Sequence, residues 1–214
     1  MTTASSAKVI PFRYNRRLQL LTALFAVVFI AAAIDPVMPE DFWAENGLVI
    51  VCVGGLVVSY RRFTFSDLSY LLIFIFLVLH EWGAHHRYAT VPVGEWAKQV
   101  FGTVRNDYDR VVHFTFGLFI AYPQYECLVR GGRLKRSWAL WLSPALILGY
   151  GAGYEVIEAA AATLLTPDAG EAFLGLQGDP WDTHKDMFMA YLGAIVAIVI
   201  TAALSRKTGP SEVR

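Results

Sequence analysis

Apolar segments long enough to cross a lipid bilayer follow one another along most of this chain of 214 residues. A membrane-spanning helix needs about 20 predominantly apolar residues, and six stretches approach that length. They predict an all-α membrane protein, a single bundle of six transmembrane helices over residues 18–204, between a cytoplasmic N-terminal segment (1–17) and a cytoplasmic tail (205–214). The predicted spans are Leu18–Ile34, Ala44–Tyr60, Leu68–His86, Tyr108–Val129, Ser137–Leu165 and Asp182–Leu204.

Composition excludes several other classes of protein. Hydrophobic residues make up 56% of the chain and charged residues only 17%, whereas an ordinary soluble domain is about a quarter charged. The 18 basic and 18 acidic residues balance, which argues against a nucleic-acid partner that needs a basic face. The two cysteines, Cys52 and Cys127, each lie inside an apolar segment. The sequence therefore predicts free thiols and neither a disulfide framework nor a cysteine-based zinc site.

Basic residues are distributed unevenly between the two ends of the predicted helices. If the N-terminus is cytoplasmic and the spans alternate, thirteen of the 18 Lys and Arg residues lie on the cytoplasmic side. The positive-inside rule therefore places both chain termini in the cytoplasm. The same arrangement puts fifteen of the 18 acidic residues, and all five histidines, in the outer loops or the outer halves of the helices. The polar residues thus gather at the outer membrane face.

Ionisable residues occur in pairs at the outer ends of the last three predicted spans. Residues three or four positions apart share a helix face, so the two members of each pair point together. Charged groups inside a membrane are costly and usually face a partner, a cavity or a pathway. The pairs therefore predict a shared polar site inside the bundle. They are Asp109 with His113, Glu155 with Glu158, and Asp182 with Asp186.

The predicted site has the ligand types of a transition-metal centre. Carboxylate and imidazole groups without thiolates suit zinc, iron or manganese, and a divalent cation would relieve the repulsion among crowded carboxylates. If the site is catalytic, Glu158 or Asp182 acts as the general base and Arg110 receives an anionic head group. The predicted metal ligands are His80, His85, Asp109, His113, Glu155 and Asp186.

Spacing leaves the inward face of the third span open. His80 and His85 lie five positions apart, so a straight helix cannot direct both of them inward. Either His80, or Glu81 together with His85, faces the bundle interior. Asp182 is equally well explained as an N-terminal helix cap, without any role in a site.

Two outer loops carry aromatic residues, prolines and glycines but little charge. They are Tyr88–Gly94 and Leu174–Trp181. Such loops can fold as a lid over a polar site. Equally, Trp96 and Trp181 can anchor the chain at the membrane interface.

Four blocks of residues, in order from the third to the sixth predicted span, carry a family resemblance. They are His80-x-x-Gly83-Ala84-His85-x-x-Tyr88 with Val91-Pro92, Asn106-x-Tyr108-Asp109-Arg110-x-x-His113-Phe114, Tyr154-Glu155-x-x-Glu158, and Leu174-Gly175-x-Gln177-Gly178-Asp179-x-Trp181-Asp182-x-x-x-Asp186-Met187. In these blocks the chain resembles the DUF2238, or YjdF-like, family of bacterial inner-membrane proteins. The resemblance implies an inner-membrane location and a shared site that includes His80 and His85, and it implies no particular reaction. The chain departs from the family pattern at Glu81 and His86, which speaks against these two as site members.

The sequence admits three classes of function. The first, which it favours, is a metal-dependent membrane hydrolase that activates water against a lipid or lipid-linked substrate. The second is a proton-coupled transporter or relay, whose pathway should continue to the cytoplasmic side. There the helices hold little that ionises besides Glu126, which is predicted to pair with Arg130. The third is a binding or structural subunit in which the polar cluster fixes helix packing. Membrane lipids are the expected partners in all three.

Overall fold

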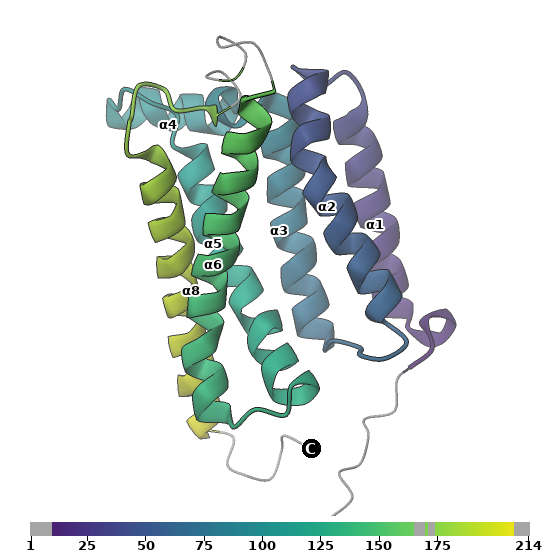
Figure 1. The fold of residues 1–214 in the computed structure, drawn as a ribbon. Helices are drawn as coiled ribbons and strands as arrows, with labels where there is room; N and C mark the ends of the chain where they lie inside the picture. Colours follow the sequence, from purple (N-terminus) through teal and green to yellow (C-terminus); the bar gives the residue numbers. More distant parts are fainter. Residues whose placement is uncertain (1–9, 165–169, 171–173, 208–214) are drawn as a thin grey trace, which may run out of the picture.

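Six long helices, running alternately up and down, form the body of the molecule (Figure 1). The computed structural model describes residues 10–164, 170 and 174–207, and no β-strand occurs within them. Four of the helices, α1, α2, α3 and α8, are long and apolar enough to cross a membrane by length and composition. The six helices are α1 (Arg16–Ala33), α2 (Pro39–Ser59), α3 (Asp67–His86), α5 (Tyr108–Glu126), α6 (Arg136–Ala162) and α8 (Asp182–Lys207).

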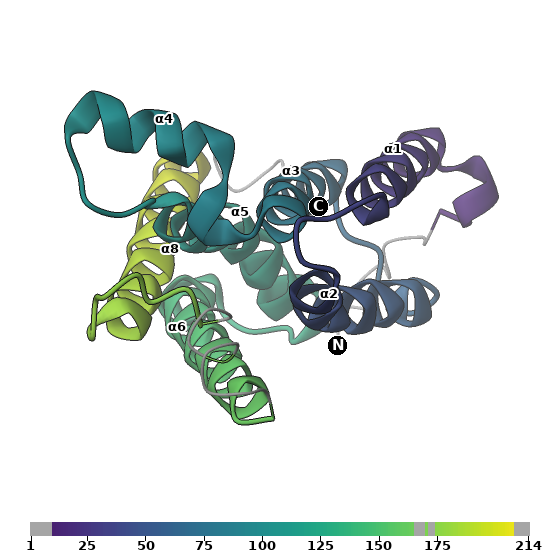
Figure 2. The same ribbon diagram turned by 90° about the horizontal axis from the view of Figure 1, so that it is seen from above.

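The helices are arranged in a row of four with two more along one side (Figure 2). The row runs α8, α5, α3, α1, and its neighbours pack against one another in that order. On the side, α6 packs against α5 and α8, and α2 packs against α3. We call the end of the bundle where α3 ends and α5 begins the upper end, as in Figure 1. The opposite end is the lower end. α1 begins there and α8 ends there, because the chain runs through the bundle an even number of times between these two points.

The start of α2 corrects the predicted boundary at Ala44, because the helix begins five residues earlier at Pro39. Proline suits the first turn of a helix, where its missing N–H has no partner to lose. Glu40 and Asp41 follow in the first turn, where the helix dipole favours acidic residues. As a result, Glu45 lies inside the helix, one turn from Asp41, and faces the interior of the bundle.

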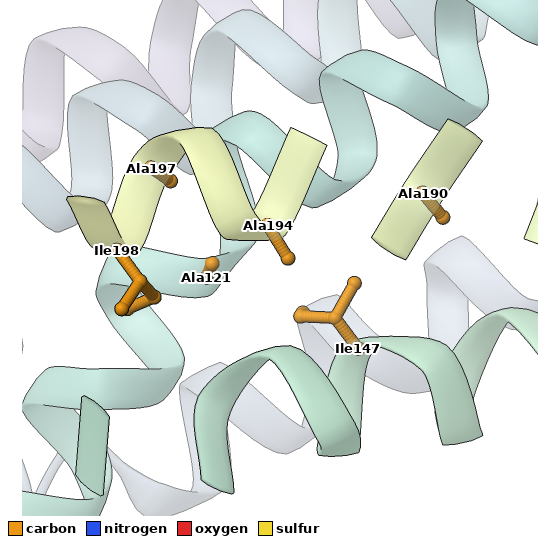
Figure 3. Packing of buried hydrophobic residues seen from close by; sticks show 6 residues of the cluster. All are labelled: Ala121, Ile147, Ala190, Ala194, Ala197 and Ile198. Carbon is orange, nitrogen blue, oxygen red and sulfur yellow. The ribbon is translucent and has the colours of Figure 1, made fainter. Parts of the chain in front are cut away.

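Small residues allow a close backbone contact between α5 and α8. A Cβ atom added to Gly117 would lie 1.8 Å from the carbonyl oxygen of Ala190, and one added to Gly193 would lie 2.0 Å from that of Phe114. Small residues let the backbones of membrane helices approach in this way. Below this contact, α5, α6 and α8 enclose an apolar core (Figure 3). Its buried residues are Ala121, Ile147, Ala190, Ala194, Ala197 and Ile198.

The segment predicted as the first outer loop is instead largely helical. A 3-10 turn (Tyr88–Thr90) leads into α4 (Pro92–Phe101), which lies across the upper end of the bundle (Figures 1 and 2). At ten residues, α4 is too short to be recognised as a span. On its inner side Gly94 packs so closely on the Asn106 side chain that a Cβ would lie 1.7 Å from Oδ1. Its outer side exposes Trp96 and Phe101.

At the lower end, Glu126 does more than form the predicted surface pair with Arg130. The two side chains are ion-paired, but the Glu126 carboxylate is buried and also accepts hydrogen bonds from the Ser66 backbone N–H, at 2.9 and 3.1 Å, and from the Ser66 hydroxyl, at 2.9 Å. Ser66 is the N-cap of α3. Glu126 therefore fastens the end of α5 to the start of α3.

Candidate functional site

A cavity of about 530 Å³ lies between α2 and α3 on one side and α5 and α6 on the other. Toward the lower end its walls are apolar, with Phe76 and Leu77 from α3 and Phe116 and Ile120 from α5. Ligand cavities of proteins typically combine apolar walls with a few polar groups. Here the polar groups gather at the upper end. They are Asp41, Glu45, His80, Arg87, Tyr88, Asp109, His113, Tyr154, Glu158 and Gln177.

His80, and not His85, faces this cavity. The His80 side chain is buried, and its Nδ1 lies 2.7 Å from the Tyr88 hydroxyl. Burial raises the pKa of Tyr88 well above its ordinary value, so the phenol stays protonated and can donate to Nδ1. His80 Nε2 has no hydrogen-bond partner among the described residues. A buried polar atom of this kind, on a side chain that lines a cavity, suits a ligand.

His85 points away from the site, toward α1. Its Nδ1 lies 2.8 Å from the carbonyl oxygen of Ala32, and it does not line the cavity. The structure therefore does not bring it to the other predicted metal ligands, because five positions along a helix rotate a side chain by more than a quarter turn away. Glu81 lies on neither wall of the cavity. It is fully buried, and neither of its carboxylate oxygens has a hydrogen-bond partner among the described residues.

The first turns of α5 and α8 bring together three groups suited to a metal ion. One ligand atom each from Asp109, His113 and Asp186 lie within 4.8 Å of one another. Asp186 is almost fully buried, and its Oδ1 has no hydrogen-bond partner among the described residues. Glu155 of α6 extends the group, since its Oε1 lies 3.6 Å from His113 Nε2, while Asp109 Oδ1 lies 3.5 Å from the same nitrogen. Three carboxylates and one imidazole suit manganese, iron or zinc.

Asp182 and Arg110 belong to a separate, ion-paired group beside these ligands. Asp182 is ion-paired with Arg105, and Arg110 lies 3.4 Å from the same carboxylate and 2.5 Å from Asp179. Although burial opposes it, the Asp182 carboxylate raises the pKa of Arg105. Asp182 is therefore held by guanidinium partners, and it does not line the cavity, unlike Glu158, the other base that the sequence predicts.

Asp179 joins the two ends of this ion-paired group at the upper surface. Lys185 Nζ lies 2.5 Å from its Oδ2, and the Trp181 backbone N–H donates to its Oδ1 at 3.1 Å. The Lys185 hydrogen bond, with those from Trp181 and Arg110, lowers the pKa of Asp179 to about 2. The carboxylate is thus ionised at any physiological pH.

The acidic residues around the site fall into two classes, according to whether an Arg or Lys side chain lies close to them. Asp107, Asp179 and Asp182 lie within 4.0 Å of Arg or Lys nitrogens. For a second set, the described residues provide no Arg or Lys nitrogen within that distance. Crowded carboxylates without such partners must bind protons or a cation. This set is Glu45, Asp109, Glu155, Glu158 and Asp186.

Three residues of the cavity are not predicted as site members from the sequence. Tyr88 and Tyr154 stand in the family blocks but receive no role there, and Glu45 falls just inside a predicted span. The Tyr154 hydroxyl donates a hydrogen bond to the Glu45 carboxylate, which links α6 to α2 across the cavity. Pro39, followed by two acidic residues, is the helix-start signal that would have placed Glu45 on an inner helix face.

The second outer loop closes part of the upper end, as a lid would. Leu174, Gly175 and Gln177 line the cavity. The Gln177 side chain accepts a hydrogen bond from the Asn106 backbone N–H at 2.9 Å and donates one to the Asn106 carbonyl at 3.0 Å. This double contact fixes the loop to the start of α5. Trp181, by contrast, is largely exposed.

Comparison with known proteins gives a family but no structural precedent. A protein-family model described as "Predicted membrane protein (DUF2238)" matches residues 17–207. The curated relative "Inner membrane protein YjdF" from Escherichia coli (strain K12) is 39% identical over 155 residues, which cover 72% of this chain and 74% of the relative. No solved structure matches the chain. The family match includes every residue of the polar groups described above.

Proposed function

The chain belongs to the DUF2238 family of predicted membrane proteins, and from its site we propose that it is a metal-dependent hydrolase of the bacterial inner membrane. Its substrate in this proposal is a lipid or a lipid-linked molecule. The observation that carries the proposal is the group Asp109, His113 and Asp186, whose ligand atoms lie within 4.8 Å of one another beside an apolar cavity.

The surface of the helices supports placement in a bilayer. Large apolar side chains such as Val27, Val58 and Val199 are 62–79% exposed on the outer faces of α1, α2 and α8. Extended apolar surface of this kind is rare on soluble monomers. We propose that all six long helices span the membrane, with the start of α1 and the end of α8 in the cytoplasm and the cavity's polar end at the periplasmic side. A reporter fused after residue 214 should then be active only in the cytoplasm, and activity only in the periplasm would reverse the orientation.

The proposed metal ion compensates charge that nothing else in the described site neutralises. Asp109, His113 and Asp186 would hold it, with Glu155 adjacent. Bound there, a divalent ion supplies a polarised water or hydroxide at neutral pH. Glu158, which lines the cavity, is the candidate base. Of the two bases that the sequence offers, Glu158 and Asp182, we prefer Glu158 because Asp182 is ion-paired with Arg105.

The transporter alternative receives less support from the cavity. A proton or ion pathway requires polar groups along the whole membrane. Below His80 and His113, the cavity is bounded by Phe76, Leu77 and Phe116. The polar groups therefore stop partway, as expected for a reaction site that receives a substrate from one side.

Metal content is the direct test. The protein, purified in mild detergent, should contain about one Zn, Fe or Mn per chain by mass spectrometry. His113→Ala and Asp186→Asn should each lose it, because even partners outside the ligand set are worth about 10–100-fold in affinity. Asp67→Asn, at the exposed lower end of α3, is the matched control and should keep the ion. If the unaltered protein and the three variants are all equally free of metal, the metal site is refuted.

Hydrolysis is tested on the metal-loaded protein with phospholipid and prenyl diphosphate substrates in micelles, and products are identified by mass spectrometry. Glu158→Gln should retain the metal ion and lose about 100-fold or more in turnover, as expected for a general base. Metal binding without turnover of any of these substrates would leave a metal site but contradict the hydrolase.

A further inference from the structure

We infer that the cavity receives a single hydrocarbon chain from the bilayer through a lateral opening between α2 and α6. This inference rests on the proposed function, since it assigns the part of a lipid substrate that the cavity binds. The polar end at His80 would then receive the head group. Four observations support this inference. They concern the exposure of the walls, the glycines of α6, the buried histidine and the polarity of the cavity.

The walls of the cavity differ in exposure from helix to helix. On α3 and α5 none of the lining residues is exposed: Leu77, His80, Ala84 and His113 are buried, and Phe76, Asp109, Phe116 and Ile120 are half-buried. On α6, Tyr150 is 47% and Ile157 54% exposed, and both line the cavity. The lining residues Leu48 and Cys52 of α2 are exposed as well. The cavity is therefore open along the line between α2 and α6, the two helices at the side of the row (Figure 2).

Two glycines keep the α6 side of the opening free of side chains. Gly149 and Gly153 lie four positions apart, so they share one helix face, and both line the cavity. A Cβ built on either residue meets no heavy atom within 4 Å. These glycines are therefore not needed for close helix packing, unlike Gly117 and Gly193. They leave a smooth groove along α6 in which an alkyl chain can lie.

The buried end of the opening carries a group that suits a polar head. His80 is 6% exposed and lines the cavity, and its Nε2 has no hydrogen-bond partner within the part of the chain that the structure describes. In the tautomer in which Nδ1 accepts from the Tyr88 hydroxyl, Nε2 carries the hydrogen and is a donor for a carbonyl, phosphate or carboxylate oxygen. The cavity thus has an apolar entrance at bilayer depth and a hydrogen-bond donor at its inner, upper end.

The size and polarity of the cavity favour one chain. Its volume of about 530 Å³ falls in the range of sites that hold one small organic ligand. An acyl or prenyl chain needs no hydrogen-bond partner, and the side chains of Phe76, Leu77, Phe116 and Ile120 on the lower walls offer none. The Tyr150 hydroxyl donates to Gln124 at 3.0 Å. A soluble polar substrate would leave most of this wall without a matching surface.

A photoactivatable, alkyne-tagged palmitic acid probe tests the inference. The protein is reconstituted in phosphatidylethanolamine and phosphatidylglycerol vesicles, irradiated with the probe, and the labelled residues are mapped by mass spectrometry. Labels on the cavity floor, at the buried Leu77 and the half-buried Phe116, report occupancy of the cavity, because lipid outside the bundle cannot reach Leu77. Labels on outer helix faces serve as the internal reference.

Gly153→Trp fills the opening, and Gly54→Trp is the matched control. Gly54 lies in α2, has the same open space around its Cβ, and does not line the cavity. We expect Gly153→Trp to lower labelling of the cavity floor by about tenfold or more, as for occlusion of a site, and Gly54→Trp to leave it unchanged. Gly149→Trp repeats the test one turn away. Unchanged floor labelling in both cavity variants, or no floor labelling in the unaltered protein, would overturn the inference.

Metal content separates this result from the proposed function. Gly153→Trp should keep the ion, because Gly153 is not a candidate ligand and its Cβ meets no neighbour. Floor labelling in a protein without metal would retain the chain-binding site and refute the hydrolase. If the protein binds metal and turns over substrate but its cavity floor is not labelled, the hydrolase stands and the chain-binding site is refuted.

Discussion

Gly117→Ala should disturb the metal site from one helical turn away. Gly117 follows His113 by one turn of α5, and Ala190 follows Asp186 by one turn of α8. The glycine contact between the two helices therefore sets the distance between the ligands that each helix carries. Replacing the glycine tests whether this packing positions the site.

The size of the effect follows from the contact distances. The new Cβ would lie 1.8 Å from the Ala190 carbonyl oxygen, whereas ordinary van der Waals contact begins at 3.4 Å, so the helices must separate by about 1.6 Å. Two ligands of one zinc ion, each at about 2.0–2.2 Å, can be at most about 4.4 Å apart. The three ligand atoms lie within 4.8 Å of one another, which leaves little room for a larger separation. A further separation of this size leaves Asp186 out of reach of an ion held by Asp109 and His113.

Metal stoichiometry and thermal unfolding in detergent measure the two parts of this prediction. Forcing a methyl group into a close contact costs about 1–3 kcal/mol, so Gly117→Ala should both unfold at a lower temperature and lose most of its metal. Gly193→Ala should behave alike, because its Cβ would meet the Phe114 carbonyl oxygen at 2.0 Å. Gly54→Ala, with open space around it, is the control. A Gly117→Ala protein with full metal content would refute the argument that this contact sets the ligand spacing.

Three further predictions concern groups outside the metal site. The pKa of Asp179 in the folded protein, about 2, lies below its ordinary value of 3.8. The contribution of this carboxylate to stability is therefore complete above pH 4 and is lost as the pH falls toward 2. Asp179→Asn should flatten the dependence of unfolding temperature on pH in this window. Glu126→Gln should lower stability by about 1–3 kcal/mol in denaturant unfolding, since an amide cannot accept all the hydrogen bonds from the start of α3, and an unchanged midpoint would show that this contact is unimportant. Glu81→Gln should leave stability unchanged or higher, because the buried Glu81 carboxyl has no ion-pair partner among the described residues and gains nothing from its charge. A large loss of stability would show that the charge matters.

The helices of this fold are largely predictable from sequence, because an apolar run of sufficient length is a local signal. Four predicted spans begin within one residue of the observed helix starts. Their first residues are Leu68, Tyr108, Ser137 and Asp182. The start of α2 is not predicted, because the acidic residues of its first turn interrupt the apolar run that defines a span, although Pro39 followed by Glu40 and Asp41 is a helix-start signal. α4 is not predicted because its ten residues fall short of a span.

The candidate site is predictable only in part. The pairing of Asp109 with His113 follows from their spacing on one helix, and the structure places them 3.5 Å apart. The separation of Asp182 from Asp186 does not follow from spacing, because the partner that takes Asp182 is Arg105, far away in the chain. Likewise, the choice between the histidines of α3 depends on where α1 packs. Helix periodicity places a residue on a face, and only the neighbouring helices decide what that face meets.

The position of α4 ties the site to the physical state of the bilayer. Its outward face presents Val93, Trp96, Val100 and Phe101, so it suits the boundary between head groups and acyl chains. Short connections join it to the end of α3 and the start of α5, the helices that carry His80 and His113. If the six helices cross the membrane, a thinner or thicker bilayer would pull α4 and the six helices toward different depths. The mismatch would act at the upper end, so turnover should vary with the acyl-chain length of the surrounding lipids.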